Sequence, residues 1–553
     1  MKTTKQQRQS LYDEYIGLYR SALEASSEFR TELEKYMRQF LGSNEIDNST
    51  ESAITVRNIT YELLESQVDP DVPYPKAGSA VYSEDGERLS GIIERLCLSV
   101  KDKLPFESLN DLDERYTYVY GGSVWYVEWD NTIAGGGGVR IHCLSPLDFV
   151  AEPGVYSVEN MKYCFLRFTT TKSELKSRWG ATDEELERAE CEYHYKEQCT
   201  DSDTVTVINC LYRDEDGDIC KLIFSGSVVL SDVPKMYKRR NEDGEYLDTE
   251  LIRDPSLSDG GLLAVPYFTP KSLPLVIRQN TRVAPTLLGL SDCERIRPQQ
   301  QAINKVESRI LKKLLRAGVT PVMPEDASIT LGNSVFGELI RMRPGESIDN
   351  YGKIDTTPDV SKDIAEADRL YDHAKRVLGI SDALQGLDTV QNESGFARQL
   401  KITRATSRLQ TKRRMKYHAY SALYRIIFEH YLAFADEPRP LNYKDGLGKG
   451  RESCFNRHEF IRRDPDGRLY YCDDFIFSVD LNGGDEYSRE VLWQRNLSNL
   501  ESGTLGDISS PSTLLRYWQS QERAHYPFAR ENVEYFEQLV QKENESASPT
   551  RKD

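Results

Sequence analysis

Apolar residues recur at three- and four-residue steps through the first forty positions, which is the period of an amphipathic helix. The stripe begins at Tyr12, continues to Phe40 and is followed by Gly42. Similar patterns over residues 51–67 and 88–104 stop at prolines, which cannot continue a helix. The N-terminal part of the chain is therefore predicted to be helical.

A β-rich region is predicted to follow. The period changes to two in residues 116–130, and the glycines at 135–138 separate this segment from VRIHCLS, so the pair indicates a hairpin with a glycine loop. The dipeptide Asp216-Gly217, a favoured tight turn, joins two later strand patterns. Those further patterns occupy residues 161–169, 205–213 and 219–226.

The middle of the chain has a helix, a small module and a second helix. Helical periodicity runs over about 284–317, with Pro298 expected to bend the helix or to lie near its first turn. Residues 319–358 are rich in Pro and Gly and contain short strand-like pieces, and helical periodicity returns at 361–379. The chain is therefore expected to go out on one helix, form a module and come back on another.

The returning helix is two-faced. Ile364, Ala367, Tyr371, Ala374 and Leu378 are predicted to form its packing side. The other side is predicted to face water and carries Lys362, Glu366, Arg369, His373 and Arg376.

After this helix, residues 380–394 lack a helical stripe and contain many turn-forming residues, which favours a loop. The longest helical pattern follows, from 395 to about 434. Two strand-like runs, 457–463 and 469–479, meet at Asp466-Gly467 and indicate another hairpin. The tail from 485 is helical again, interrupted by Gly503, Gly506 and Pro511, and its polar end ENESASPTRKD is expected to be disordered.

Composition narrows the functional classes. The chain has 553 residues and a net charge of −18, which argues against a protein that wraps nucleic acid over its whole surface. Any DNA contact must be local.

No stretch approaches eighteen consecutive apolar residues, and the N-terminus MKTTKQQRQS does not lead into an apolar signal core. We therefore expect a protein made in the cytoplasm that does not enter a membrane. The ten cysteines are scattered without a paired framework, so they are expected to be reduced and no disulfide is assigned.

The sequence contains no motif that indicates a catalytic centre or a cofactor site. GLGKGRES (446–453) lacks the spacing of a phosphate-binding loop, no His lies four residues after His458, and no GxSxG elbow is present. The acidic segments at 214–218 and 464–467 are better explained as hairpin turns than as calcium loops. The chain is therefore predicted not to be an enzyme.

One group of residues has the ligand types of a zinc site, but its spacing does not favour a metal. The group consists of Cys191, His194, Cys199 and Cys210, whose spacing matches no common zinc finger or ribbon.

The clearest electrostatic signal is a basic stripe on the long helix, where no acidic residue falls between Ser394 and Phe428. Such a stripe must meet negative charge, either a DNA backbone or an acidic surface of the same or a neighbouring subunit. Its members are Arg398, Lys401, Arg404, Arg408 and Lys412.

Over roughly residues 50–480, this order of elements resembles the portal proteins of tailed bacteriophages. Three segments are similar to the wing of that family, where a helix leads into a hairpin and a turn. They are NITYELLESQVDPDVPYPK (58–76), GGSVWYVEWD (121–130) and LSPLDFVAEPGVYSVENMKYCFLRF (144–168).

The resemblance implies an α+β portal fold with an α/β wing, a two-helix stem, a small α/β clip, a tunnel loop, a long kinked helix and a helical crown. The implied boundaries are 1–45 for an N-terminal helix, 46–283 for the wing, 284–318 for the stem helix, 319–360 for the clip, 361–379 for the returning stem helix, 380–394 for the tunnel loop, 395–437 for the long kinked helix, 438–484 for a wing β-hairpin, and 485–553 for the crown and a disordered tail.

The resemblance also implies a function. The family forms a ring, usually of twelve subunits, at one capsid vertex of the virion, and is a late protein assembled in the host cytoplasm. The ring is the channel for packaging, retaining and ejecting double-stranded DNA. The clip would bind the terminase large subunit and later a head-to-tail adaptor, and the ring would meet major capsid and scaffolding proteins.

The tunnel loop is implied to face DNA, with a surface loop as the alternative, and the charged side of the returning helix is expected to line the channel below it. The candidate DNA-contacting residues of the loop are Leu384, Gln385, Asp388, Thr389, Gln391 and Asn392.

Two rival functions remain open. The first rival is another head-completion or connector protein, although such chains are usually much shorter. A metal-dependent nuclease would need an acidic metal-binding constellation that the sequence does not show. The first 45 residues and the segment 190–250 match no motif of the family.

Overall fold

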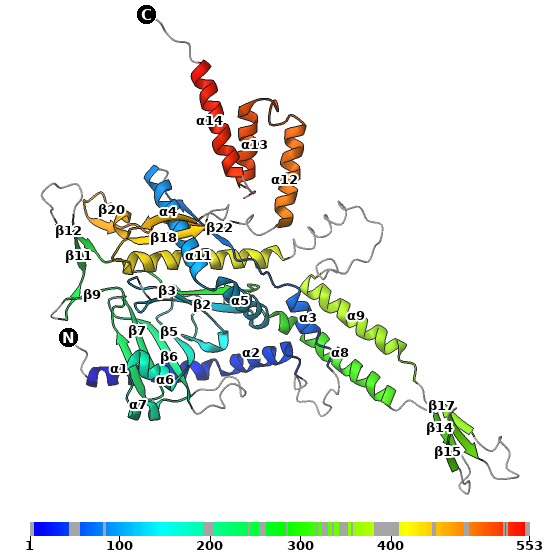
Figure 1. Cartoon of the computed structure of the whole chain (residues 1–553). Coiled ribbons are helices and arrows are strands. Elements are labelled where there is room, and N and C mark those ends of the chain that lie inside the picture. Colours follow the sequence, from blue (N-terminus) through cyan, green and yellow to red (C-terminus); the bar gives the residue numbers. More distant parts are fainter. Residues whose placement is uncertain are drawn as a thin grey trace, which may run out of the picture. The chain divides into compact units, whose positions relative to one another are not determined.

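The computed structural model shows a mixed α+β protein (Figure 1). It forms two compact units. The first unit comprises Met1–Leu33, Val68–Leu290 and Gln410–Asp553, and the second comprises Glu34–Gln67 and Ser291–Leu409. The structure describes residues 5–43, 56–80, 84–133, 135–191, 203–241, 244–253, 262–283, 286–315, 319–322, 330–334, 337–341, 352–355, 358–380, 409–444, 450–480, 486–523, 526 and 529–547.

A five-stranded antiparallel sheet forms one part of the first unit. Helix α1 (Lys5–Ala25) packs on it through Tyr12, Tyr15 and Tyr19, whose rings contact aromatic residues of the strands. The predicted hairpin at Asp216-Gly217 is confirmed. The strands follow the order β4 (Phe149–Ala151), β5 (Tyr163–Thr171), β6 (Thr204–Arg213), β7 (Ile219–Ser225) and β8 (Val228–Val233).

A three-stranded sheet, in the order β13 (Leu275–Gln279), β2 (Gly122–Asp130) and β3 (Gly138–Leu144), lies in the largest apolar core. Pairing of β2 with β3 confirms the predicted glycine-loop hairpin. The strand predicted from residue 116 is wrong at its start, because 116–120 belong to helix α5. Helices α4 (Glu84–Lys103), α5 (Phe106–Tyr120) and α11 (Gln410–Phe434) supply residues to the same core.

Two-stranded antiparallel ribbons complete the β structure of the described part of the first unit. Strand β20 (Ile461–Arg463) pairs with β21 (Leu469–Tyr471), which confirms the predicted hairpin at Asp466-Gly467. The continuation at 475–480 does not belong to that hairpin, because it pairs with β1. The other pairs are β1 (Tyr74–Ser79) with β22 (Phe475–Asp480), β9 (Arg239–Arg240) with β10 (Tyr246–Leu247), β11 (Thr249–Arg253) with β12 (Leu262–Pro266), and β18 (Arg439–Lys444) with β19 (Gly450–Phe455).

Short and C-terminal helices complete the first unit. The first two C-terminal helices are separated at the interruption that was predicted from Gly503, Gly506 and Pro511. Residues 543–547 of the expected disordered tail are helical, because α14 continues to Ala547. The remaining elements are α6 (Lys172–Trp179), α7 (Asp183–Arg188), η1 (Pro146–Asp148), η3 (Arg457–Phe460), α12 (Glu486–Glu501), α13 (Pro511–Arg523) and α14 (Ala529–Ala547).

The second unit contains the predicted helix, module and returning helix. Helix α8 (Asp292–Leu315) and helix α9 (Ser361–Leu378) lie side by side, and the strands between them in sequence lie beyond one end of the pair (Figure 1). Strand β14 (Val319–Val322) follows α8 and pairs antiparallel with β17 (Gly352–Asp355), which precedes α9. Between them, β15 (Thr330–Ser334) and β16 (Gly337–Arg341) form a hairpin.

Several helix boundaries differ from the sequence prediction. The first long pattern divides into α1 and α2 (Ser27–Phe40), and the helix predicted over 51–67 is α3 (Ile59–Glu65) in the described residues. Helix α8 begins at Asp292, after the predicted start, and keeps Pro298 inside its first two turns. Among the described residues, no helix is both long and apolar enough to span a bilayer.

Candidate functional site

The charged side of α9 is positioned as the sequence predicted. Lys362, Arg369, His373 and Arg376 are exposed, and Glu366 is half-buried. Arg369 donates from Nε to Glu366 at 2.8 Å, and this hydrogen bond lowers the pKa of Glu366. The face therefore carries exposed positive charge that Glu366 neutralises only in part.

The packing side of α9 agrees with the prediction at three of its five residues, Tyr371 is half-buried, and Ile364 differs. Ala367, Ala374 and Leu378 are buried, but Ile364 is 47% exposed. Asp363 takes the packing position and binds α8, where Arg309 lies 2.8 Å and Lys313 2.5 Å from its carboxylate. The hydrogen bond from Lys313 is the main reason that the pKa of Asp363 is lowered.

A small apolar core joins the two helices. Val306 and Ile310 of α8 pack with Ala367 of α9, flanked by the partly buried Val360 and Leu370. Together with the ion pairs of Asp363, these contacts fix the antiparallel register, because Lys313 lies at the level of Asp363 and Ile310 near Ala367.

Polar contacts that the sequence did not reveal fix α3 and α2 on α8. Thr60 donates from its hydroxyl to Gln300 at 2.9 Å, and Gln39 donates to Thr60 and to the main-chain oxygen of Cys293, both at 3.0 Å. All three polar side chains are buried. Such residues carry no periodic apolar signal, so sequence patterns could not identify their role.

The tunnel-loop prediction falls outside the described residues. This applies to Leu384, Gln385, Asp388, Thr389, Gln391 and Asn392, and also to Arg398, Lys401, Arg404 and Arg408 of the basic stripe.

Lys412 is the member of the basic stripe that the structure describes. It is 9% exposed, and its ammonium group lies 4.9 Å from the centre of the Tyr118 ring. A cation over an aromatic face is a stabilising contact. Lys412 therefore contacts a partner in its own chain.

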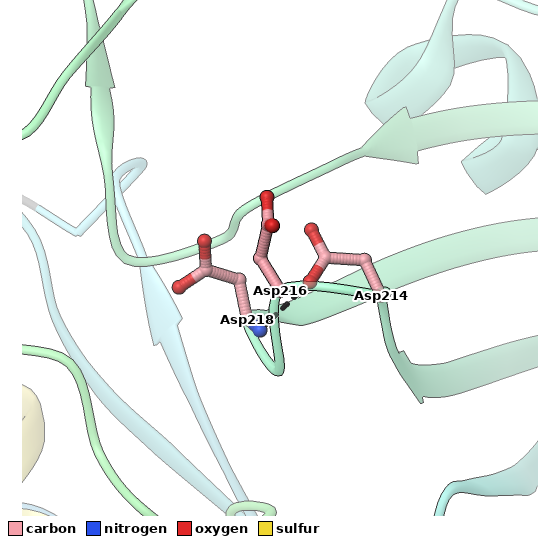
Figure 2. A group of neighbouring side chains, drawn as sticks. All are labelled: Asp214, Asp216 and Asp218. Atoms are coloured by element: carbon pink, nitrogen blue, oxygen red, sulfur yellow. Dashed lines mark hydrogen bonds between the residues drawn. The ribbon is translucent and has the colours of Figure 1, made fainter.

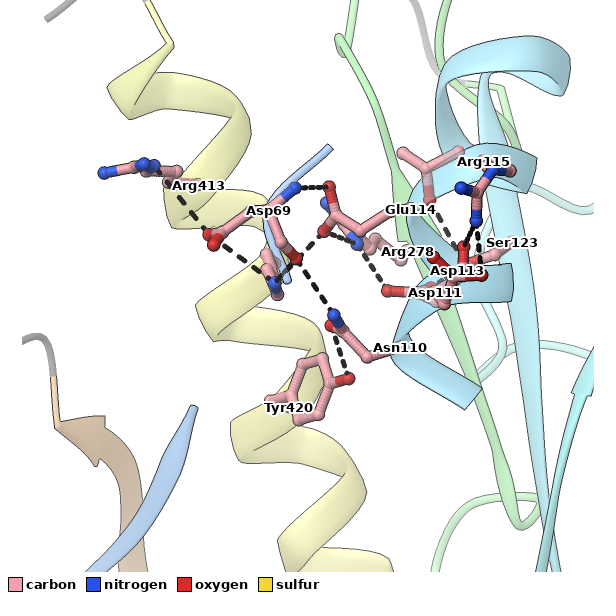
Figure 3. A network of polar contacts seen from close by, with 12 residues as sticks. Asp69, Asn110, Asp111, Asp113, Glu114, Arg115, Ser123, Arg278, Arg413 and Tyr420 are labelled. Atoms are coloured by element: carbon pink, nitrogen blue, oxygen red, sulfur yellow. Dashed lines mark hydrogen bonds and ion pairs between the residues drawn. The ribbon is translucent and has the colours of Figure 1, made fainter. Parts of the chain in front are cut away.

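A buried network of charges surrounds the start of α11 (Figure 3). Arg278 of β13 donates to Glu114 at 2.7 Å and also binds Asp113, and all three are at most 2% exposed. Lys416 of α11 lies 3.2 Å from Glu114 and donates to the main-chain oxygens of Asp69 and Asp71. The network joins α5, β13 and α11 to the segment around Asp69.

The electrostatics of this network hold Glu114 ionised. Burial alone would raise the pKa of its carboxyl, but Arg278 and Lys416 outweigh burial, and the pKa is lowered. Further hydrogen bonds satisfy the neighbouring polar groups: Trp125 donates to Asp113 at 2.8 Å, and Tyr420 donates to Asn110 at 2.9 Å. These buried contacts pair the charges across three elements, so the network stabilises the packing of α5, β13 and α11.

The acidic turn of the β6–β7 hairpin brings Asp214, Asp216 and Asp218 within metal-binding distance of one another (Figure 2). Two ammonium groups compensate much of the negative charge of this cluster. Lys235 lies 2.6 Å from Asp216 and 3.3 Å from Asp218, and Lys238 lies 3.0 Å from Asp218. The hydrogen bond to Asp216 raises the pKa of Lys235. The hairpin interpretation of this acidic segment is confirmed.

The cysteine and histidine group considered for zinc is described only in part. Cys210 is completely buried in the apolar core between α1 and the five-stranded sheet, and burial raises the pKa of its thiol. Cys191 is half-buried, and His194 and Cys199 lie outside the described residues. Cys210 therefore acts as a small apolar core residue.

No protein-family model matches the sequence, and no curated protein matches it significantly.

Proposed function

We propose that this chain is the portal protein of a tailed bacteriophage, a subunit of the ring-shaped DNA channel at one capsid vertex. The observation that supports this proposal is the order α8, β14 to β17, α9. Two antiparallel helices lead to and from a small β module. This is the arrangement expected of a stem and a clip.

The outward side of α9 is the surface proposed to face DNA. Lys362, Arg369, His373 and Arg376 project on the side away from α8, and Glu366 lies among them. Exposed cations attract phosphates without fixing a sequence register, because phosphate contacts carry no base information. The overall charge of −18 opposes tight binding. Attraction by the exposed cations and repulsion by the overall negative charge together favour a channel wall along which DNA slides.

Lys412 is left out of the proposed DNA surface. Its ammonium group is buried against Tyr118, and moving it to a phosphate would cost that contact. The tunnel-loop residues and Arg398 to Arg408 remain in the proposal as predictions from the sequence.

The proposed partners follow from the same assignment. They are further copies of the chain in a ring, usually of twelve, double-stranded DNA in the channel, the terminase large subunit and a head-to-tail adaptor at the clip, and major capsid and scaffolding proteins. The proposed location is the portal vertex of the virion, after assembly in the host cytoplasm. The proposed role is to guide and retain DNA without bond chemistry.

Negative-stain imaging of the purified full-length chain tests the proposal directly. Rings with a central hole wide enough for a DNA duplex are the expected result. A population of compact monomers over a broad range of protein concentration would contradict it. A nuclease assay with Mg²⁺ or Mn²⁺ on the same preparation tests the rival enzymatic function, and no cleavage is expected.

Charge reversal on α9 tests the DNA-facing assignment within assembled rings. Replacing Arg369 and Arg376 with Glu should leave ring formation intact and weaken the retention of duplex DNA by purified rings, with the largest loss at low salt. The matched control replaces Lys103 and Arg468, exposed residues of the first unit, with Glu. Equal loss of retention in both variants would show that net charge, and not this face, governs the contact.

A further inference from the structure

A stripe of basic residues runs along α8 and has no role in the function proposed above. Lys305, Arg309 and Lys312 follow at steps of four and three residues, so they share one face of the helix. All three are exposed. Lys305 and Lys312 form no ion pair within the described part of the chain, and Arg309 keeps 57% of its side chain exposed although it binds Asp363. Positive charge is therefore available on this face.

An acidic face lies elsewhere on the same helix pair. The guanidinium group of Arg57 lies 3.8 Å from Glu307 of α8 and 3.5 Å from Asp368 of α9, which places these two acids on one side. Glu62 of α3 belongs to this side as well, because it accepts a hydrogen bond from Tyr371 of α9. Asp368 keeps 64% of its side chain exposed, so a single Arg57 leaves excess negative charge.

The two charged faces point in opposite directions. Residues two positions apart on a helix project about 200° apart. Arg309 is two positions from Glu307, so the basic stripe lies on the side of the pair opposite to Arg57. The two faces also lie at the same level, since Arg309 contacts Asp363, which is little more than one turn from Asp368.

Apolar residues continue both faces toward the β module. Leu315 follows Lys312 by three residues and is 73% exposed, and Ile364 precedes Asp368 by four residues and is 47% exposed. Lys313 binds Asp363, so both apolar residues lie at the same end of the helix pair. If the basic face of one copy covered the acidic face of another copy, Leu315 and Ile364 would both be buried in the contact.

We propose that the Lys305–Arg309–Lys312 stripe of one copy docks against the Glu62, Glu307 and Asp368 face of the next copy. Contacts between two different faces are heterologous, and they close into a ring when the rotation between copies permits it. Opposite charges at matched levels set the register between copies. This inference rests on the proposed function, and it leaves the outward side of α9 free to face the channel.

A pair of charge-reversal variants tests the docking. The first variant replaces Lys305 and Lys312 with Glu, and the second replaces Glu307 and Asp368 with Lys. Each variant alone should lose rings in negative stain and in light scattering after size exclusion, because like charges then face each other at every contact. An equimolar mixture should recover rings in which the two variants alternate, because every contact again joins opposite charges.

The control and the contradicting outcomes separate this inference from the proposed function. A variant with Lys103 and Arg468 replaced by Glu carries the same change of net charge as the first variant and should form rings like the wild type. If the wild type forms rings and the first variant does so equally well, the docking surface is wrong and the portal assignment stands. If the wild type forms no rings, both the docking surface and the portal assignment are wrong.

Two further results also decide the matter. Failure of the equimolar mixture to recover rings, when both variants melt at the wild-type temperature, contradicts the charge pairing. Rings of normal yield that lose DNA retention when Lys305 and Lys312 are replaced would show instead that the stripe binds DNA.

Discussion

The ammonium group of Lys416 lies 3.2 Å from a carboxylate oxygen of Glu114, and neither side chain is more than 1% exposed. The same lysine also donates to main-chain oxygens of Asp69 and Asp71. These contacts connect the start of α11 with α5 and with the segment that precedes β1. They form within a network of charges that includes Arg278 and Asp113.

Replacing Lys416 with Met should destabilise the protein strongly. Removing one partner of a buried ion pair leaves the other charge uncompensated and typically costs about 3–5 kcal/mol. Urea unfolding followed by tryptophan fluorescence measures the change. Arg414→Ala, at an exposed position of the same helix, should change the stability by less than about 0.5 kcal/mol. Similar small effects of both substitutions would show that Lys416 is dispensable.

Glu429 should make stability fall as the pH rises. Burial raises its pKa to about 7 in the folded protein, and Asp473 adds to this while Arg425 opposes it. The unfolded carboxyl has the ordinary pKa of about 4.5, so between these two pKa values the unfolded state binds fewer protons and is increasingly favoured as the pH rises. The stability contributed by the protonated form is fully present below that lower value and is lost as the pH passes through about 7.

Glu429→Gln measures this contribution. The difference in melting temperature between variant and wild type should be small at acidic pH and should grow in favour of the variant as the pH rises to 8. The variant is compared with the wild type at each pH, because His430 also titrates. Burial lowers the pKa of His430 to about 4, so this residue makes stability rise with pH below its ordinary pKa. A difference that is independent of pH would contradict the raised pKa of Glu429.

Gly121 should not tolerate alanine. Its φ angle is +86°, and an added Cβ would lie 2.2 Å from the carbonyl oxygen of Gly289. The left-handed conformation alone costs a residue with a Cβ roughly 1–2 kcal/mol, and the clash adds to it. Thermal melting should show a marked loss for Gly121→Ala. Gly78→Ala, where the Cβ meets nothing within 4 Å, should melt near the wild type.

The acidic turn should not bind calcium in the wild type. Lys235 pairs with Asp214, Asp216 and Asp218, and Lys238 pairs with Asp218, so an ion would have to compete with these ammonium groups. Millimolar Ca²⁺ should therefore leave the melting temperature unchanged. Lys235→Asn should gain a calcium-dependent rise, because it removes one ammonium group at a residue with a φ of 49° that Asn tolerates. A rise in the wild type would contradict this explanation.

Sequence periodicity was a sound guide to the elements that bury one face. The two helices around the β module, the hairpins at Asp216-Gly217 and Asp466-Gly467, and the exposed charges of α9 all follow from the spacing of apolar residues and from turn chemistry. Periodicity was a weaker guide where a helix is buried on several sides. The run before Gly121 alternates like a strand, but its tyrosines lie in α5, because a helix buried on several sides also accepts apolar residues at alternate positions.

The sequence by itself determined the order of the elements and the charged side of α9, because both depend on residues close together in the chain. Only the tertiary structure decided which charged side chains are buried and paired inside the fold. Lys412 and Lys416 belong to the same basic segment as exposed Arg414, but Tyr118, Asp69 and Glu114 bury the two lysines. Those partners lie hundreds of residues away in sequence, and a periodic pattern carries no information about contacts at that distance.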